Sequence, residues 1–220
     1  MLNNPKAVLF DLDGTLLDTM GDIAEAVNHV LRTERLEERS VEEIRGFLGT
    51  GPKTLILKAI YGNDNFEPEG TERLLKIFRE YYDKNLDVKT QPYPRTSEML
   101  DSVKKSGKSI AVVSNKYDAA VHRLCDLYFP GIFGTVFGMR ENMPKKPEPE
   151  ALFEALDILG VRAEDALYVG DSEVDVEAAK NAGICCIGCS WGFRGRKFLE
   201  KIGCKLIIDS WDELNSLLKL

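Results

Sequence analysis

Two carboxylates lie two residues apart in the stretch Asp11-Leu12-Asp13-Gly14-Thr15, directly after a short apolar run. Residues two apart on a strand point to the same side, so Asp11 and Asp13 are expected to emerge together at the carboxyl end of a strand. Carboxylates held this close repel each other unless a cation lies beside them, and Mg²⁺ prefers carboxylates together with waters and phosphate oxygens. Gly14 permits a sharp turn, and Thr15 offers a hydroxyl to a phosphate group. Taken alone, the pentapeptide fits a surface Asp-Gly turn equally well.

Polar residues at later positions favour the chemical interpretation. Ser114 and Asn115 follow the apolar run 110–113, and Asp171 follows the run 166–169, with Asp175 one helical turn beyond it. Lys146 stands just ahead of an expected helix start. Each has an ordinary alternative, as a helix cap, a turn residue or a solvated charge. A carboxylate pair, a hydroxyl, a lysine and a further carboxylate in this order nevertheless indicate one site at one edge of a sheet.

The elements that would position these residues alternate along the chain. Continuous apolar runs, typical of strands buried on both faces of a parallel sheet, occupy residues 7–10, 110–113, 166–169, 184–187 and 206–208. Helices expected at 96–105, 149–159 and 175–181 each end near a glycine, the usual residue just past a helix. This pattern predicts an α/β fold with a doubly wound parallel-sheet (Rossmann-like) core, in which ligands bind at the carboxyl ends of the strands.

The stretch 18–91 breaks the alternation, because it contains no convincing buried strand. Amphipathic helices are expected there at 22–32, 40–48, 53–61 and 71–84. Ser40 and Glu43 have the spacing of a capping box, which satisfies free backbone N–H groups at a helix start. We therefore predict a catalytic core made of residues 1–17 and 92–220, with an inserted α-helical cap at 18–91.

The composition of the chain excludes some classes of protein. The chain has 220 residues, 44% of them hydrophobic, and a formal net charge of -7, which argues against a nucleic-acid binder or a binder of anionic membranes. No apolar stretch approaches the roughly 20 residues that cross a bilayer. The first six residues lack a signal-peptide pattern, so a cytoplasmic location is expected.

The cysteines and histidines do not have the spacing of a second metal or catalytic site. Cys185, Cys186 and Cys189 lie in or beside the apolar run at 184–187, and no second cysteine pair or nearby histidine completes a metal-ligand set. They are expected to be buried, reduced thiols of a strand. The two histidines are isolated within helical patterns, where packing or surface roles are expected.

With these motifs in order, the whole chain resembles the haloacid dehalogenase superfamily of phosphatases. The Asp11–Thr15 motif, Ser114, Lys146 and Asp171 match its four signature regions, and the helical insert resembles its α-helical cap. The segments Phe47–Gly51 and Ser190–Arg194 resemble the phosphoglycolate phosphatase-like group.

The resemblance implies a role for each residue. Asp11 is the nucleophile that forms an aspartyl phosphate, and Asp13 is the general acid and then the general base. Mg²⁺ is held by Asp11, by the backbone carbonyl of Asp13 and by Asp171. Ser114 and Lys146 hold the transferring phosphoryl oxygens, Thr15 and Asn115 contribute to phosphate binding, and Asp175 supports Lys146 or the metal waters.

Asp13 distinguishes among reactions of the superfamily, since dehalogenases and phosphonate-cleaving members lack an aspartate at this position. An ester leaving group needs a proton donor, so a phosphatase is favoured. A nucleotidase or pyrophosphatase of the same superfamily remains open. So do a phosphosugar mutase and a non-catalytic phospho-ligand sensor, although a sensor should have lost a motif residue.

A helical cap would exclude macromolecules and favour a small phosphorylated metabolite, with 2-phosphoglycolate as the first expectation. Arg45, Gly49 and Thr50 are candidate substrate contacts in the cap, because a cationic, amide-rich loop suits a carboxylate. Arg194 is a candidate on the core side. A plain interhelical turn with solvated charges is the alternative for the cap loop. The oligomeric state is left open between a monomer and a homodimer.

Overall fold

The computed structural model describes residues 4–63 and 69–220. The chain forms two compact units: Met1–Asp18 together with Pro92–Leu220, here called the α/β unit, and Thr19–Gln91, here called the helical unit. Each unit has its own secondary structure and its own buried side chains.

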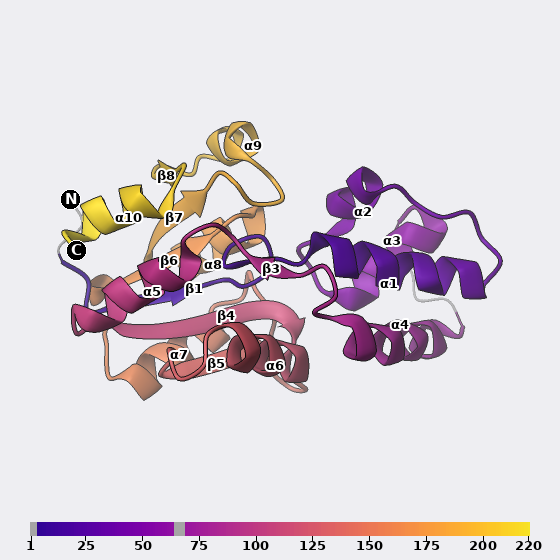
Figure 1. Ribbon diagram of the computed structural model, residues 1–220, viewed down its shortest axis with the longest axis horizontal. Helices are drawn as coiled ribbons and strands as arrows, with labels where there is room; N and C mark the ends of the chain where they lie inside the picture. Colours follow the sequence, from indigo (N-terminus) through magenta and orange to yellow (C-terminus); the bar gives the residue numbers. More distant parts are fainter. Residues whose placement is uncertain (1–3, 64–68) are drawn as a thin grey trace. The chain divides into compact units, whose positions relative to one another are not determined.

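The α/β unit is built on a six-stranded sheet in which every adjacent pair of strands is parallel (Figure 1). Its strand order is β5 (Thr135–Met139), β4 (Ser109–Tyr117), β1 (Ala7–Phe10), β6 (Ala166–Gly170), β7 (Cys185–Cys189) and β8 (Ile207–Ile208). The order reverses direction at β1, so the carboxyl end of β1 lies at the switch point where such sheets bind ligands.

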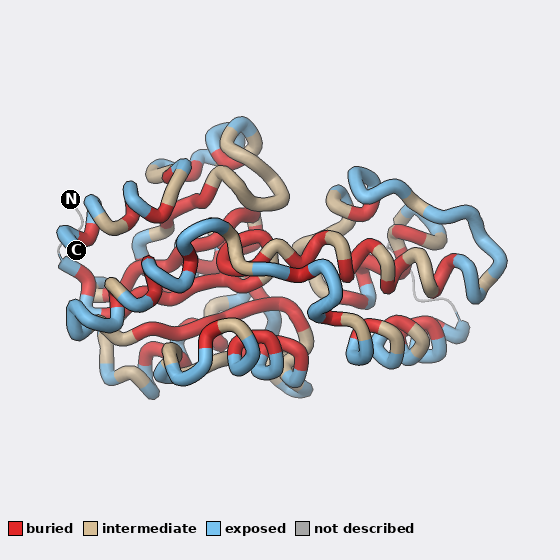
Figure 2. The backbone as a smooth tube through the Cα atoms, viewed as in Figure 1, coloured by how far each residue is buried: buried red, intermediate tan, exposed pale blue. Residues whose placement is uncertain are grey.

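Helices cover both faces of this sheet, which is why the central strands are buried throughout (Figure 2). Phe10 of β1 contacts Trp211 of α10 (Trp211–Leu218), and α10 packs on α5 (Thr96–Lys105). Leu9, which points to the other face, shares a core with residues of α7 (Glu150–Leu159) and α8 (Glu173–Ala182). Helix α6 (Asp118–Tyr128) covers β4 and β5, and α9 (Arg196–Lys201) lies against β7 and β8.

The predicted α/β class with a doubly wound core is confirmed, and three details differ. Strand β5 was not predicted, because Gly138 interrupts its short apolar run and its first two residues are half-buried. Strand β4 runs on to Tyr117 through its pairing with β5, so Ser114 and Asn115 lie inside the strand rather than after it. Cys185 is exposed, contrary to the prediction of a buried thiol, because it opens β7 at the sheet's amino-terminal edge.

The described residues of the helical unit form four helices, each of which contacts at least two of the others. They are α1 (Met20–Thr33), α2 (Val41–Phe47), α3 (Pro52–Tyr61) and α4 (Thr71–Asn85). Ser40 and Glu43 form the predicted capping box at the start of α2. Two short paired strands, β2 (Leu17–Asp18) and β3 (Gln91–Pro92), lie where the chain leaves and re-enters the α/β unit. Among the described residues, no helix is long and apolar enough to span a membrane.

Candidate active site

The turn after β1 begins with Asp11, whose backbone N–H continues the sheet by donating to the Val169 carbonyl at 2.9 Å. Gly14 has a φ of +82°, and a Cβ there would lie 2.4 Å from Oδ2 of Asp171. This position therefore requires glycine, both for its left-handed backbone and for the approach of Asp171. Because β1 and β6 pair in parallel, this tight turn lies against Asp171, the first residue after β6.

Lys146 lies at the centre of the site with its ammonium fully enclosed. Its Nζ is 2.9 Å from Oδ1 of Asp11, 2.7 Å from Oδ1 of Asp175, 2.7 Å from the Tyr168 hydroxyl and 2.9 Å from the Val113 carbonyl. The lysine is 3% exposed. A buried ammonium is retained only with such acceptors around it, so the position of Lys146 is fixed by four neighbouring groups.

Asp175 belongs to the start of α8 and uses both carboxylate oxygens within the protein. Oδ1 accepts from Lys146, and Oδ2 accepts from the backbone N–H groups of Asp171 and Ser172 and from the Ser172 hydroxyl. Ser172 and Asp175 form a reciprocal capping box. A Cβ at Gly170 would lie 2.4 Å from the Asp175 Cβ, so this glycine lets α8 start close to β6. Asp175 thus orients Lys146 and the Asp171 backbone.

The charges of this cluster shift its pKa values in different directions. Burial raises the pKa of Asp11 to about 6, against the opposing pull of Lys146. Burial, together with the nearby carboxylates of Asp175 and Asp11, raises the pKa of Asp171 well above its usual range. The pKa of Asp175 is lowered, because Lys146 and its hydrogen bonds outweigh the effect of burial.

The donor set fits a divalent cation. One carboxylate oxygen from each of Asp11, Asp171 and Asp175 lies within 4.8 Å of the others, and all three residues are buried. Lys146 contacts Asp11 and Asp175, whereas the neighbouring carboxylates still raise the pKa of Asp171, so a cation at this cluster would relieve their mutual repulsion. Hard carboxylate oxygens are the ligands that Mg²⁺ prefers.

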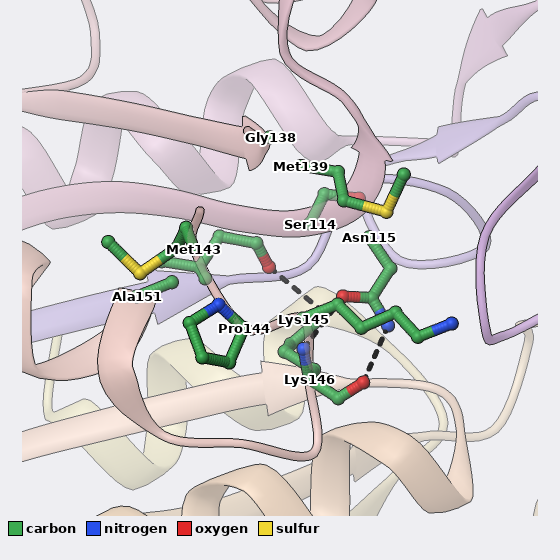
Figure 3. A pocket seen from close by; sticks show the side chains of 10 residues that line it. Ser114, Asn115, Gly138, Met139, Met143, Pro144, Lys145, Lys146 and Ala151 are labelled. Carbon is green, nitrogen blue, oxygen red and sulfur yellow. Dashed lines mark hydrogen bonds between the residues drawn. The ribbon is translucent and has the colours of Figure 1, made fainter. Parts of the chain in front are cut away.

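A small pocket beside this cluster is lined by β4, β5 and the segment before α7 (Figure 3). Ser114 and Asn115 contribute to it from β4, and Lys145 and Lys146 from the opposite side. The Asn115 amide donates to the Lys146 carbonyl and accepts from its N–H, both at 2.9 Å. Asn115 therefore fixes the backbone of the lysine segment, and Ser114 lies in the same wall.

Asp13 forms an ion pair with a residue that the sequence analysis missed. Lys116 Nζ lies 2.9 Å and 3.0 Å from the two carboxylate oxygens of Asp13. Lys116 lies two residues after Ser114 on β4, and the same spacing rule that linked Asp11 to Asp13 could have indicated it. Tyr168 was also missed, because it reads as one more apolar residue of a buried strand.

Other predicted site residues have contacts of their own. Thr15 is fully buried, its hydroxyl 3.8 Å from the Cys189 thiol, and Arg194 forms a two-pronged ion pair with Glu173 at 2.9 Å for each contact. Arg45 lies in α2, and Gly49 and Thr50 lie between α2 and α3, within the helical unit. Contact of these residues with a substrate stays a prediction.

Relatives with assigned activities match most of the chain. The phosphoglycolate phosphatase of Aquifex aeolicus (strain VF5) is 37% identical over 189 residues, covering 86% of this chain and 86% of that protein. The phosphoglycolate phosphatase of Pseudomonas fluorescens (strain Pf0-1) is 33% identical over 219 residues, covering 96% of this chain and 78% of that protein.

Solved structures and a family profile agree with these relatives. A structure from Lactobacillus delbrueckii subsp. bulgaricus has a TM-score of 0.90 at 31% identity and covers 98% of both chains. CbbY from Rhodobacter sphaeroides, solved in complex with phosphate, has a TM-score of 0.80 at 27% identity, covering 98% of this chain and 100% of that chain. The profile described as haloacid dehalogenase-like hydrolase matches residues 8–189. The chain therefore belongs to the haloacid dehalogenase-like hydrolase family.

Proposed function

We propose that this protein is a Mg²⁺-dependent phosphatase that hydrolyses a small phosphomonoester, with 2-phosphoglycolate as the favoured substrate, through an aspartyl phosphate. The observation that carries the proposal is the buried cluster in which Asp11 meets Lys146 beside Asp171. Family membership and relatives named as phosphoglycolate phosphatases support it.

The nucleophile of the proposed reaction is Asp11, whose carboxylate attacks phosphorus and releases the alcohol. Lys146, 2.9 Å from Asp11, is placed to hold a phosphoryl oxygen, together with Ser114 in the neighbouring wall. Asp13 gives a proton to the leaving oxygen and then takes one from the attacking water. Splitting one displacement into two steps of this kind is the usual gain from covalent catalysis.

A metal site in this proposal is formed by Asp11, Asp171 and the backbone carbonyl of Asp13. When bound, Mg²⁺ supplies positive charge that lets an anionic nucleophile meet an anionic phosphate. Asp175 keeps Lys146 and the Asp171 backbone in place. Thr15 and Asn115 are proposed to contribute to phosphate binding, and Asn115 also holds the backbone of the lysine segment.

The helical unit is proposed to act as the cap, with Arg45, Gly49 and Thr50 as substrate contacts, and Arg194 as a contact on the α/β unit. A cationic group and backbone amides suit the carboxylate of 2-phosphoglycolate. Cytoplasmic location and a monomeric or homodimeric state stay predictions from the sequence.

Phosphate release from a panel of small esters tests the function, with Mg²⁺ present and then chelated. The panel contains 2-phosphoglycolate, pyrophosphate, nucleoside monophosphates, hexose phosphates and xylulose 1,5-bisphosphate, which is bound in a structure of CbbY. We expect Mg²⁺-dependent release with 2-phosphoglycolate preferred, and no turnover by Asp11→Asn. Retained turnover by that variant would refute the nucleophile. Preference for another ester would replace the substrate and keep the reaction.

A further inference from the structure

The Tyr168 hydroxyl is a buried polar group in direct contact with Lys146. Tyr168 lies in β6 and is 0% exposed. Its oxygen is 2.7 Å from Lys146 Nζ, and its hydroxyl donates to the Val113 carbonyl at 2.9 Å. A second acceptor, Oδ1 of Asp175, lies 3.1 Å from the same oxygen. A phenylalanine would fill this part of the core equally well, so the hydroxyl has a role beyond packing.

The oxygens around Lys146 Nζ outnumber its protons. An ammonium has three N–H groups to donate. Four oxygens lie within 2.9 Å of it, and they belong to Asp11, Asp175, Tyr168 and Val113. Hydrogen bonds to carboxylates are the stronger ones, so two of the N–H groups serve Asp11 and Asp175. The third N–H is left for the two neutral oxygens.

One of these neutral oxygens, the Val113 carbonyl, lies just past the paired part of β1 and β4. The last pair of these strands is Phe10 with Val112. Lys146 Nζ and the Tyr168 hydroxyl both reach the Val113 carbonyl, at 2.9 Å each. Val113 is 1% exposed, and a buried carbonyl that loses its partner is costly. Because the tyrosine donates to this carbonyl, the lysine can turn away and leave it paired.

The proposed reaction requires such a turn, because Lys146 has to direct one N–H at a phosphoryl oxygen. The third N–H is the one whose departure costs least, since the other two neutralise buried carboxylates. With the Tyr168 hydroxyl present, the Val113 carbonyl keeps a donor after this move. Without the hydroxyl, the carbonyl and the substrate would compete for the same N–H.

We propose that Tyr168 is a positioning residue for Lys146: its hydroxyl covers the Val113 carbonyl and so leaves one ammonium N–H for the phosphoryl group. This inference rests on the proposed function. It gives β6 a part in phosphate binding through a residue outside the four signature regions. Since Tyr168 acts through the lysine, its effect is the same for every ester and does not involve the metal.

The test removes the hydroxyl and keeps the ring, with Tyr168→Phe. We expect kcat/KM to fall about 5- to 100-fold, the range for a buried group left without its partner, and by the same factor for each ester that the wild type hydrolyses. The Kd for inorganic phosphate, measured by isothermal titration calorimetry with Mg²⁺ present, should rise by about fivefold or more. The Mg²⁺ concentration at the midpoint of the Mg²⁺-dependent rise in Tm should not change.

Tyr82→Phe is the matched control, because it removes the hydroxyl of another buried tyrosine, in α4. It should change neither kcat/KM nor the affinity for phosphate. If Tyr168→Phe does not fold, Tyr168→Met replaces it, because the flexible methionine adapts to an irregular space and has no hydroxyl.

Three results would overturn the inference. The first is a folded Tyr168→Phe variant with the kcat/KM and phosphate affinity of the wild type. The second is a Mg²⁺ midpoint that rises together with the Kd for phosphate, because the hydroxyl would then act on Asp175 and the Asp171 backbone that it holds. The third is failure of both Tyr168 variants to fold, which would assign the hydroxyl to folding alone.

The phosphate titration separates this inference from the proposed function. A wild type that hydrolyses no ester of the panel overturns the proposed function. Weaker phosphate binding in Tyr168→Phe would even then support the role of Tyr168. A wild type that neither hydrolyses an ester nor binds phosphate overturns both.

Discussion

Lys146 is the cation that balances the buried carboxylates at the centre of the candidate site. Its ammonium is 3% exposed and lies between Asp11 and Asp175, with Tyr168 and a backbone carbonyl completing its surroundings. Removing it would leave buried carboxylates facing one another without their cation. Removal of Lys146 is therefore expected to lower the free energy of unfolding by more than the contribution of any one of its contacts.

We expect Lys146→Met to lose phosphatase activity and also to destabilise the fold by about 3–5 kcal/mol, the usual effect of removing one partner of a buried ion pair. Urea denaturation followed by circular dichroism measures the second effect independently of turnover. Lys145→Met is the matched control, because the neighbouring lysine is exposed. A Lys146→Met variant as stable as the wild type would mean that a group other than Lys146 compensates the charge of the buried carboxylates.

Cys204 gives a second prediction at this scale. A hydrogen bond from the Cys186 thiol and contacts with backbone groups lower the pKa of Cys204 to about 7, whereas burial raises the pKa of Cys125 to about 12. A lowered pKa means that the reactive thiolate forms at lower pH. Cys204 is buried, so its ionisation is followed by the ultraviolet absorbance of the thiolate rather than by a reagent that needs access to the sulfur. The titration should show a midpoint near pH 7 that is absent from Cys204→Ser.

Cys186→Ala is the control for that experiment, because it removes the hydrogen bond that favours the thiolate. The absorbance midpoint of Cys204 should then move up toward the ordinary value of about 8.5. A wild-type midpoint already at that value would contradict the effect of the paired thiol.

The sequence was informative about the site where a residue stands next to a strand end. Asp11 and Asp171 follow short apolar runs, and the structure brings them together with Lys146 and Asp175. Lys116 escaped notice because an isolated lysine reads as a solvated charge. Its burial depends on the pairing of β4 with β5, which no local pattern reveals.

At the scale of elements, glycines allow strand ends and turns to approach more closely than other residues would. A Cβ at Gly192 would lie 2.2 Å from the Asp171 Cβ and 2.6 Å from the Gly14 carbonyl oxygen. The loop after β7 therefore packs closely against Asp171, the residue that follows β6. Its Phe193 N–H also donates to Oδ2 of Asp171, at 2.6 Å.

Gly192→Ala should displace Asp171 and raise the Mg²⁺ concentration needed for half-maximal activity by about tenfold or more, as is typical when groups that orient metal ligands are disturbed. Titration of phosphatase activity with Mg²⁺ measures this. Gly46→Ala is the control, because it lies in α2 and a Cβ there meets nothing within 4 Å. An unchanged Mg²⁺ requirement in Gly192→Ala would place the metal away from Asp171.

Elements with strong local signals were predicted well, and those with weak signals were not. Helix α5 has the predicted ends, and the Ser40 capping box forms as expected. Strand β5 was missed, because its short apolar run contains a glycine and partly exposed residues. Only its pairing with β4 makes it recognisable as a strand. Local sequence indicates continuous buried strands better than it indicates edge strands.

At the scale of the whole molecule, a bound cation is linked to the stability of the fold. Lysine and arginine number 29 against 36 aspartates and glutamates, giving a formal net charge of -7, and three of the acidic groups are buried in one cluster. A ligand that binds only the folded state stabilises it by mass action, by about 2.7 kcal/mol at a hundred times its Kd.

We therefore expect Mg²⁺ to raise the Tm of the wild type and EDTA to reverse the rise, as measured by differential scanning calorimetry. Asp171→Asn should abolish the Mg²⁺-dependent rise. Asp157→Asn, which makes the same change of charge at an exposed position on α7, should preserve it. A rise that persists in Asp171→Asn would show that the cation binds elsewhere.

The paired strands β2 and β3 have a consequence for how such a chain can change over evolution. Asp18 and Pro92, which flank the helical unit in sequence, belong to these neighbouring strands, and the Tyr93 N–H donates to the Leu16 carbonyl at 3.1 Å. Residues 19–91 therefore form a single loop of the α/β unit, which the chain leaves and re-enters at neighbouring positions. Exchange of that loop for another, long or short, would leave the order of the sheet unchanged. New specificities could thus arise by recombination at two adjacent positions, without rebuilding the residues that carry the reaction.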